Sequence, residues 1–133
     1  MARSYKLELI TPEGRVYESE VVHLRAPGLE GDFGILADHA PIMAALRIGK
    51  LHVDEPTNSF DFAVSGGYLE GHENQIVLLA ETCERKESID IERASRARDR
   101  AVKRLTEMTE GIDIDRARAA LMRALNRLHV AES

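Results

Sequence analysis

The chain has 133 residues and a formal net charge of −5, with 44% hydrophobic and 31% charged residues. This composition excludes a disordered chain and predicts a folded protein with one ordinary domain, or a small domain with an appendage. No apolar run approaches the roughly 20 residues of a membrane-spanning helix, and the first residues lack the apolar core of a signal peptide, so we expect a cytoplasmic protein. The single cysteine, Cys83, cannot form an internal disulfide and is expected to act as a small apolar residue.

The charge is unevenly distributed along the chain. Residues 1–87 contain 8 basic and 15 acidic side chains, whereas residues 88–133 contain 10 basic and 8 acidic ones. The two parts are therefore expected to meet different partners. The basic side chains of the second part alternate with acidic ones and have no aromatic neighbours, which argues against a nucleic-acid partner.

Short strands separated by Gly-rich and Pro-rich turns are predicted along the first part of the chain. Tyr5–Thr11 alternates polar and apolar residues as a half-buried strand does, and Pro and Gly follow it in favoured turn positions. Further strands are predicted at residues 15–26, 45–53, 60–65, 68–70 and 75–81. Turns or breaks are expected at residues 31–34, 66–67 and 71–74, and a turn or bulge within the strand is expected at Gly49. The pattern predicts an antiparallel β-sandwich or barrel.

The second part repeats a six-residue phrase, IDIERA at residues 89–94 and IDIDRA at residues 112–117. Each copy opens a stretch with helical spacing, and Gly111 separates the two stretches. Asp90 and Asp113 stand where helix N-caps are expected. The apolar stripe of the first helix is predicted at Ile91, Ala94, Ala97, Ala101, Leu105 and Met108. The stripe of the second is predicted at Ile114, Ala117, Leu121, Ala124 or Leu125, and Leu128.

These patterns divide the chain into a β-domain of residues 1–87 and a helical hairpin of residues 88–133, joined by a charged linker at residues 84–88. Two helices of this size cannot enclose their own apolar stripes. The hairpin must therefore dock on the β-domain or on a partner, and two alternative docking states are plausible.

No set of residues predicts catalysis or metal binding, so the chain is expected to be a non-enzyme. The histidines show no metal-ligand spacing; they are His23, His39, His52, His72 and His129. His39 follows Asp38 and precedes Ala40-Pro41, which is more typical of a turn histidine than of a general base. There is no phosphate-binding loop, nucleophile elbow or dinucleotide fingerprint.

Four arginines of the hairpin suggest an anion site. Arg93 and Arg100 are seven residues apart and share a helix face, as do Arg123 and Arg127, which are four apart. If the two faces converge, four guanidinium groups need an anion between them, and phosphate suits their planar fork. The alternative is a solvated face with ordinary ion pairs, such as Glu92 with Arg96 and Asp99 with Lys103.

Several motifs in order resemble the epsilon subunit of the rotary ATP synthase of bacteria and chloroplasts. They are residues 30–51 (EGDFGILADHAPIMAALRIGKL), ITPEG at 10–14, SGGYLE at 65–70 and ALNRLHVAE at 124–132. The resemblance implies a sandwich of two five-stranded sheets, about ten strands, followed by two helices. It also implies a non-catalytic subunit of the central rotor of a proton-translocating ATP synthase, peripheral on the cytoplasmic face of the cell membrane.

The resemblance further implies partners and regulation. The sandwich would bind the gamma subunit and the ring of c subunits. The folded hairpin would permit turnover, and the hairpin extended along gamma would contact the catalytic beta and alpha subunits and inhibit ATP hydrolysis.

In Bacillus-like members of this family the folded hairpin binds ATP through a motif Ile/Leu-Asp-x-x-Arg-Ala, which Ile89, Asp90, Arg93 and Ala94 match. The remaining family contacts correspond to Glu84, Arg100, Arg123 and Arg127. ATP, alone or with magnesium, is therefore the expected regulatory ligand, and the second copy of the phrase is interpreted mainly as a helix start. The competing interpretation is an adaptor whose basic hairpin binds acidic protein surfaces and senses no nucleotide.

Overall fold

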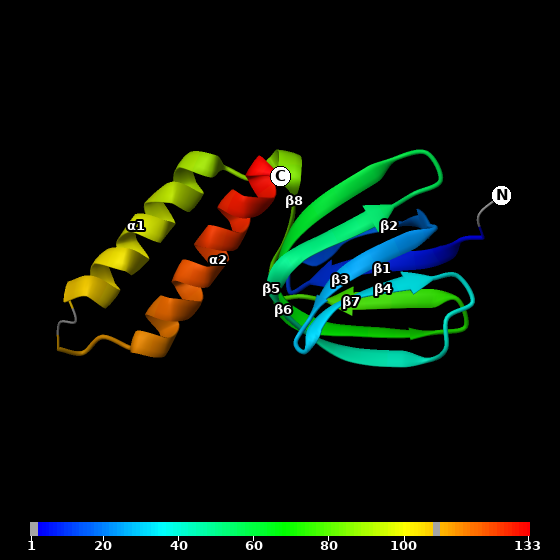
Figure 1. Cartoon of the computed structure of the whole chain (residues 1–133), viewed down its shortest axis with the longest axis horizontal. Coiled ribbons are helices and arrows are strands. Elements are labelled where there is room, and N and C mark those ends of the chain that lie inside the picture. Colours follow the sequence, from blue (N-terminus) through cyan, green and yellow to red (C-terminus); the bar gives the residue numbers. More distant parts are fainter. Residues whose placement is uncertain (1–2, 108–109) are drawn as a thin grey trace. The chain divides into compact units, whose positions relative to one another are not determined.

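A computed structural model describes residues 3–107 and 110–133 of the chain. The chain folds as two compact units, Met1–Arg85 and Lys86–Ser133. The first is built from strands and the second from helices (Figure 1). None of the helices among the described residues is long and apolar enough to cross a membrane.

Eight strands form the first unit. They are β1 (Tyr5–Thr11), β2 (Gly14–Val21), β3 (His23–Gly28), β4 (Gly31–Leu36), β5 (Ile42–Asp54), β6 (Ser59–His72), β7 (Gln75–Leu79) and β8 (Cys83–Arg85). Their hydrogen-bonded order is β2-β1-β7-β6-β5-β3-β4, and β8 pairs with β6. Neighbouring strands are antiparallel except β1 and β7, which are parallel.

The two layers of the sandwich share their longest strands. The second half of β6 pairs with β7, whereas its first half pairs with β8. Likewise, the second half of β5 supplies most of the pairing with β3. β5 and β6 each contribute one segment to each layer (Figure 1). The eight strands therefore correspond to the about ten strands that the family resemblance implied.

The glycines at the predicted breaks lie inside these long strands. Gly49 remains within β5, and Gly66 and Gly67 remain within β6 with φ angles of 68° and 120°. The strand predicted over residues 45–53 therefore continues through Gly49, whereas the predicted break at residues 66–67 is wrong. The predicted turn at residues 31–34 is also wrong, because β4 begins at Gly31, which pairs with Gly28 across a two-residue turn.

One apolar core fills the sandwich, and it is built from residues that alternate along the strands. Tyr5, Leu7 and Leu9 of β1 point inward, while Lys6 and Glu8 between them are only partly buried. The buried members of the core are Tyr5, Leu7, Leu9, Tyr17, Val21, Leu24, Ala26, Ile35, Leu46, Leu51, Val53, Phe62, Val64, Leu69, Ile76, Leu78 and Ala80. Cys83 packs against this core, and burial raises the pKa of its thiol to about 12, consistent with an inert apolar role.

The second unit contains the short 3₁₀ helix η1 (Lys86–Ser88) and the helices α1 (Ile91–Glu107) and α2 (Ile114–Glu132). The predicted linker at residues 84–88 therefore has regular structure, namely the end of β8 and η1. α1 and α2 lie antiparallel (Figure 1). Gly111 has a positive φ of 87° in the connection between them.

Alanines form the seam of the hairpin. Ala94, Ala101, Ala117 and Ala124 are at most 3% exposed, and they recur every seven residues in each helix. This spacing keeps them on one face of each helix, and their small side chains permit a close approach of the two backbones. Of the predicted stripe, Ile91 is exposed, so its assignment is wrong, and Met108 lies outside the described residues. Ala124 rather than the exposed Leu125 occupies the position that the sequence left open.

Candidate functional site

The four arginines predicted as an anion site lie at matching levels of the hairpin. Arg100 is seven residues before the end of α1, and Arg123 is nine residues after the start of α2. Arg93 is fourteen residues before the end of α1, and Arg127 is thirteen residues after the start of α2. Because both helices rise by about 1.5 Å per residue, the antiparallel arrangement places each arginine of α1 level with one of α2.

The arginines also lie on the same side of the seam. Each seam alanine is directly preceded by an arginine, as in Arg93-Ala94, Arg100-Ala101 and Arg123-Ala124. Successive residues of an α-helix are rotated by about 100° about the helix axis. Each of these arginines is therefore displaced from its seam alanine by the same angle and in the same direction about its own helix axis. In an antiparallel pair with two-fold symmetry, the same sense of rotation corresponds to the same side of the pair. Arg127, four residues after Arg123, stays on that side.

Three of these side chains have no charged partner. Arg93, Arg100 and Arg123 are exposed, and within residues 3–107 and 110–133 their guanidinium groups take part in no ion pair. Arg127 is half-buried. The predicted pair of Glu92 with Arg96 is present at 3.9 Å.

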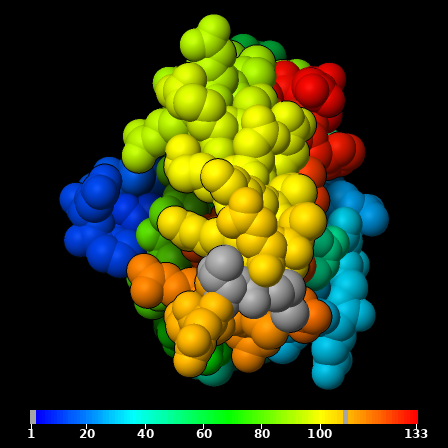
Figure 2. Space-filling view, turned by 90° about the vertical axis from the view of Figure 1, so that its left-hand side faces the viewer, coloured from blue at the N-terminus to red at the C-terminus, as the bar shows by residue number. Residues whose placement is uncertain are grey.

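The ordinary ion pairs of α1 belong largely to a different face of the helix. Asp99 accepts a hydrogen bond from Arg98 Nε at 3.1 Å, in place of the predicted pair with Lys103. Glu92, Arg96, Asp99 and Lys103 are all exposed, and by helical phase they lie on the α1 surface turned away from α2, which Figure 2 shows in yellow. The solvated face predicted as the alternative therefore exists, but it is separate from the flank that carries Arg93 and Arg100.

The remaining predicted ATP-binding residues have different surroundings. Ile89 and Ala94 are buried. The Asp90 carboxylate accepts a hydrogen bond from the backbone N–H of Arg93 at 3.0 Å, so it caps α1 as predicted. Glu84 is half-buried in β8, where it pairs with Ala63 of β6.

A second candidate surface, which the sequence did not predict, is an apolar stripe on the sandwich. Met43 of β5, Tyr68 of β6 and Leu79 of β7 are 72%, 61% and 50% exposed. Tyr68 pairs with Leu79 on one side and with Ala45 on the other, so the stripe crosses three neighbouring strands. The only sequence signal was the occupation of outward-facing strand positions by large apolar residues.

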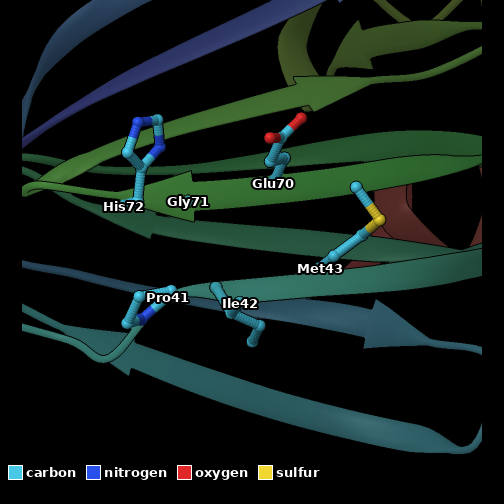
Figure 3. Close-up of a pocket in the computed structure, with 6 residues that line it drawn as sticks. All are labelled: Pro41, Ile42, Met43, Glu70, Gly71 and His72. Atoms are coloured by element: carbon cyan, nitrogen blue, oxygen red, sulfur yellow. The ribbon is translucent and has the colours of Figure 1, made fainter.

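A shallow hollow adjoins this apolar stripe. Its lining residues are Pro41, Ile42, Met43, Glu70, Gly71 and His72 (Figure 3). Met43 and Glu70 are cross-strand partners, and both are exposed. The hollow extends the stripe toward the end of β6 and gives it a mixed apolar and acidic rim.

His52 and His39 make structural contacts within the sandwich. The His52 ring bonds Asp61 Oδ1 through Nδ1 at 2.7 Å and Asp54 Oδ1 through Nε2 at 2.9 Å. Burial opposes the charged imidazole, but these two carboxylates outweigh it and raise the pKa of His52. His39 contacts the Tyr5 ring edge-on at 5.6 Å, as a packed turn residue does. Among residues 3–107 and 110–133, no group of three or more acidic, histidine or cysteine side chains could hold a metal ion.

Comparisons with known proteins define the class of the chain as an ATP synthase subunit of the delta/epsilon type. The family model "ATP synthase, Delta/Epsilon chain, beta-sandwich domain" matches residues 4–86, and the corresponding "long alpha-helix domain" matches residues 87–132. The ATP synthase epsilon chain of Desulforamulus reducens is 45% identical over 105 residues, which are 79% of this chain and 80% of the relative. That of Carboxydothermus hydrogenoformans is 47% identical over 109 residues, which are 82% of this chain and 81% of the relative. The chain therefore belongs to the bacterial ATP synthase epsilon chain family, whose members are a non-catalytic subunit of the enzyme complex.

Solved structures share the fold. A chain of the Euglena gracilis mitochondrial ATP synthase matches with a TM-score of 0.82 and 20% identity, over 100% of this chain and 84% of that one. A chain of the Tetrahymena thermophila mitochondrial ATP synthase matches with a TM-score of 0.60 and 14% identity, over 98% of this chain and 96% of that one. At these identities the likeness concerns the fold alone.

Proposed function

We propose that the protein is a subunit of the central rotor of a bacterial proton-translocating ATP synthase. In this proposal the sandwich binds the gamma subunit and the c ring, and the helical hairpin regulates ATP hydrolysis. The similar solved chains come from assemblies described as OSCP/F1/c-ring and as central stalk/c-ring, which supports a place at the rotor. Binding to these partners would hold the protein peripherally at the cytoplasmic face of the cell membrane.

Binding of the sandwich to the rotor is supported by the exposed apolar stripe of Met43, Tyr68 and Leu79. Large apolar side chains that are contiguous and exposed typically mark protein interaction surfaces. Aromatic residues and methionine are enriched at such interfaces, and tyrosine is among the residues that contribute most to binding energy. We therefore assign this stripe to the binding of the gamma subunit.

Co-purification with the gamma subunit tests this assignment. Tyr68→Asp should weaken gamma binding at least tenfold, because it places a charge in the middle of the apolar stripe. Leu36→Asp is the matched control, since Leu36 is 65% exposed but lies on β4 at the edge of the other layer. Both variants should retain the thermal stability of the wild type. Equal gamma affinities for Tyr68→Asp and wild type would refute the assignment.

We further propose that the folded hairpin binds ATP through the flank of Arg93, Arg100, Arg123 and Arg127. Three unpaired guanidinium groups on one side of the seam leave positive charge uncompensated, and phosphate oxygens would satisfy it. A ligand that binds only the folded hairpin stabilises it by mass action. A fall in ATP would then release the hairpin to extend along gamma and inhibit hydrolysis through contacts with the beta and alpha subunits.

An ATP titration of the full chain, with and without magnesium, tests this sensor by calorimetry. Arg100→Ala should weaken ATP binding about tenfold or more, because a charge-assisted hydrogen bond contributes about 1.5–3 kcal/mol. Arg96→Ala is the control, since Arg96 belongs to the outer face and pairs with Glu92. Equal affinities for the two variants, or no binding to wild type at millimolar ATP, would reject the sensor.

A second candidate function keeps the inhibitory hairpin but omits the nucleotide. The exposed arginines and the positive balance of residues 88–133 also favour binding to acidic surfaces of the beta and alpha subunits. In that case inhibition of hydrolysis should weaken with added salt and should be insensitive to prior incubation of the chain with ATP. Under the sensor proposal, the same incubation should delay inhibition.

A further inference from the structure

A group of histidine and aspartate side chains crosses three neighbouring strands of the sandwich. His23 Nδ1 lies 3.3 Å from Asp54 Oδ2, and His52 Nε2 lies 2.9 Å from Asp54 Oδ1. His52 Nδ1 lies 2.7 Å from Asp61 Oδ1, and Ser59 Oγ donates a hydrogen bond to Asp54 Oδ1 at 2.6 Å. These five residues form the His52 network. Its members come from β3, β5 and β6, so the network links side chains of three strands that are neighbours in the sheet.

The hydrogen bonds of the His52 ring require a charged imidazole. A neutral imidazole has one N–H group, and its other nitrogen presents a lone pair. At His52 each ring nitrogen lies within hydrogen-bond distance of a different carboxylate oxygen, and an ionised carboxylate only accepts hydrogen bonds. A neutral ring would therefore turn a lone pair toward one of these oxygens, whereas the imidazolium ion donates to both. The ring thus holds one more proton in this geometry than a neutral histidine does.

The other charged groups around His52 come from the strands on both sides of it. Arg25 of β3 is its direct cross-strand partner, and Lys50 lies two residues before it on the same face of β5. Glu84 of β8 lies in the same cross-strand row as Lys50. Arg25 Nε lies 3.8 Å from Asp32 of β4, so a carboxylate outside the network offsets its positive charge. The two network carboxylates bond the ring directly, so their charges have the strongest effect on it.

The backbone pairing beside the network is short. β3 pairs with β5 at three consecutive residues and then, after a register shift, at Gly28. Next to the network, the Val22 N–H donates to the Asp54 carbonyl oxygen at 2.8 Å. β5 is the strand through which β3 and β4 join the rest of the sheet. Asp54 therefore connects two sets of bonds, because its side chain bonds His52 and its backbone holds the edge of the β3–β4 ribbon.

We infer that a proton held on His52 fastens the β3–β4 ribbon to β5 and β6, and that alkaline pH loosens this edge of the sandwich. Loss of the proton leaves one N–H for two carboxylates, so either Asp54 or Asp61 loses its bond to the ring. Burial opposes the charged ring, but the bonds to the two carboxylates outweigh it and raise the pKa of His52. The fastening is therefore complete below about pH 6.5 and is lost as the pH rises through the folded pKa. The inference is independent of the proposed rotor and sensor functions.

Nitrogen-15 NMR of the His52 ring tests the protonation step in the full chain. In wild type the ring should change from imidazolium to neutral imidazole at a pH above its ordinary value of about 6.5. Asp61→Asn should lower this midpoint, because it removes one of the two bonded charges. Glu70→Gln is the matched control, since it removes a carboxylate from the other half of β6 and should leave the midpoint unchanged. A wild-type midpoint at or below about 6.5, or one that Asp61→Asn does not lower, would overturn the inference.

Amide hydrogen exchange tests the fastening itself. The protection factor of the Val22 amide should fall about threefold or more between about pH 6 and about pH 9, a modest effect because the His52 side chain is 36% exposed. The Ala80 amide, which donates to Ile10 in the other layer, should keep its protection factor. His52→Gln should make Val22 protection independent of pH, because glutamine donates a hydrogen bond but takes up no proton.

His23→Gln is the matched control for this experiment. It removes the outer imidazole of the network but keeps the bonds of the His52 ring, so the fall in Val22 protection should remain. A Val22 protection factor that is constant in wild type, or that falls equally in His52→Gln, would overturn the fastening role of His52. An equal fall at Ala80 would also overturn it, because the whole sandwich rather than its β3–β4 edge would then respond to pH.

Discussion

Gly67 stands where β6 passes from one layer of the sandwich to the other, and its replacement should disrupt the pairing of β6 with β7. Its φ angle is 120°, which L-residues with a side chain rarely adopt. A Cβ atom at this position would lie 1.9 Å from the Leu79 carbonyl oxygen and 2.9 Å from Ala80 Cα. Both are backbone atoms, so no side chain can rotate away to relieve the contact.

The cost of Gly67→Ala follows from these two effects. A positive φ costs an alanine about 1–2 kcal/mol. The clash moves β7 away from β6, and each weakened backbone hydrogen bond costs about 1 kcal/mol. Ala80 also donates to Ile10 of β1 at 2.9 Å, so the displacement spreads to the next strand. We expect a loss of about 3 kcal/mol or more, a large fraction of the 5–15 kcal/mol typical of a domain.

Gly66→Ala is the matched control for this experiment. Gly66 also has a positive φ, 68°, but the nearest atom to its Cβ position is the Leu46 carbonyl oxygen at 4.0 Å. Gly66→Ala should therefore lower the free energy of unfolding by only about 1–2 kcal/mol, which is the cost of a positive φ for an alanine. Urea denaturation followed by circular dichroism measures both losses. Equal losses in the two variants would refute the argument, because backbone strain alone would then account for both.

Three further predictions concern the sandwich. Because the pKa of His52 is raised in the folded state, its stabilising effect should be complete below about pH 6.5 and lost as the pH rises through the folded pKa. The stability difference between wild type and His52→Gln should thus be larger at about pH 6 than at about pH 9, and a constant difference would contradict this. Arg85 lies 4.3 Å from the centre of the Phe60 ring, so Arg85→Ala should lower the free energy of unfolding by about 0.5–1 kcal/mol, whereas Lys86→Ala should have little effect. A chain ending at Glu87 should unfold cooperatively, because the core lies wholly within residues 5–83, and a noncooperative transition would show that the sandwich depends on the hairpin.

Local chemistry predicted the hairpin well. Asp90 and Asp113 mark the helix starts because a cap bonds backbone groups only three residues away. The predicted apolar stripes of the two helices included Ala94, Ala101 and Ala117 of the seam for a similar reason, since the residues of one helix face are set by the helix repeat. The arginine flank could be inferred from the same periodicity, and the antiparallel arrangement then placed Arg93 level with Arg127.

The strands were harder to predict because their ends depend on distant partners. A glycine pair such as Gly66-Gly67 indicates unusual backbone geometry from the sequence alone. Whether the chain stops there or bends and continues depends on β5, which pairs with β6 on both sides of the bend. The same reasoning explains the turn expected at residues 31–34, where pairing of β4 with β3 extends the strand to Gly31.

The amino-acid sequence by itself determined the two parts of this protein, the starts of both helices and the arginines of one helical flank, because each depends on residues within one or two turns of chain. Only the tertiary structure showed that Met43, Tyr68 and Leu79 form one apolar stripe, since residues from three strands become neighbours through hydrogen-bond register. Tertiary structure likewise decided between Ala124 and Leu125 at the seam, because the close approach of two helices admits the smaller side chain.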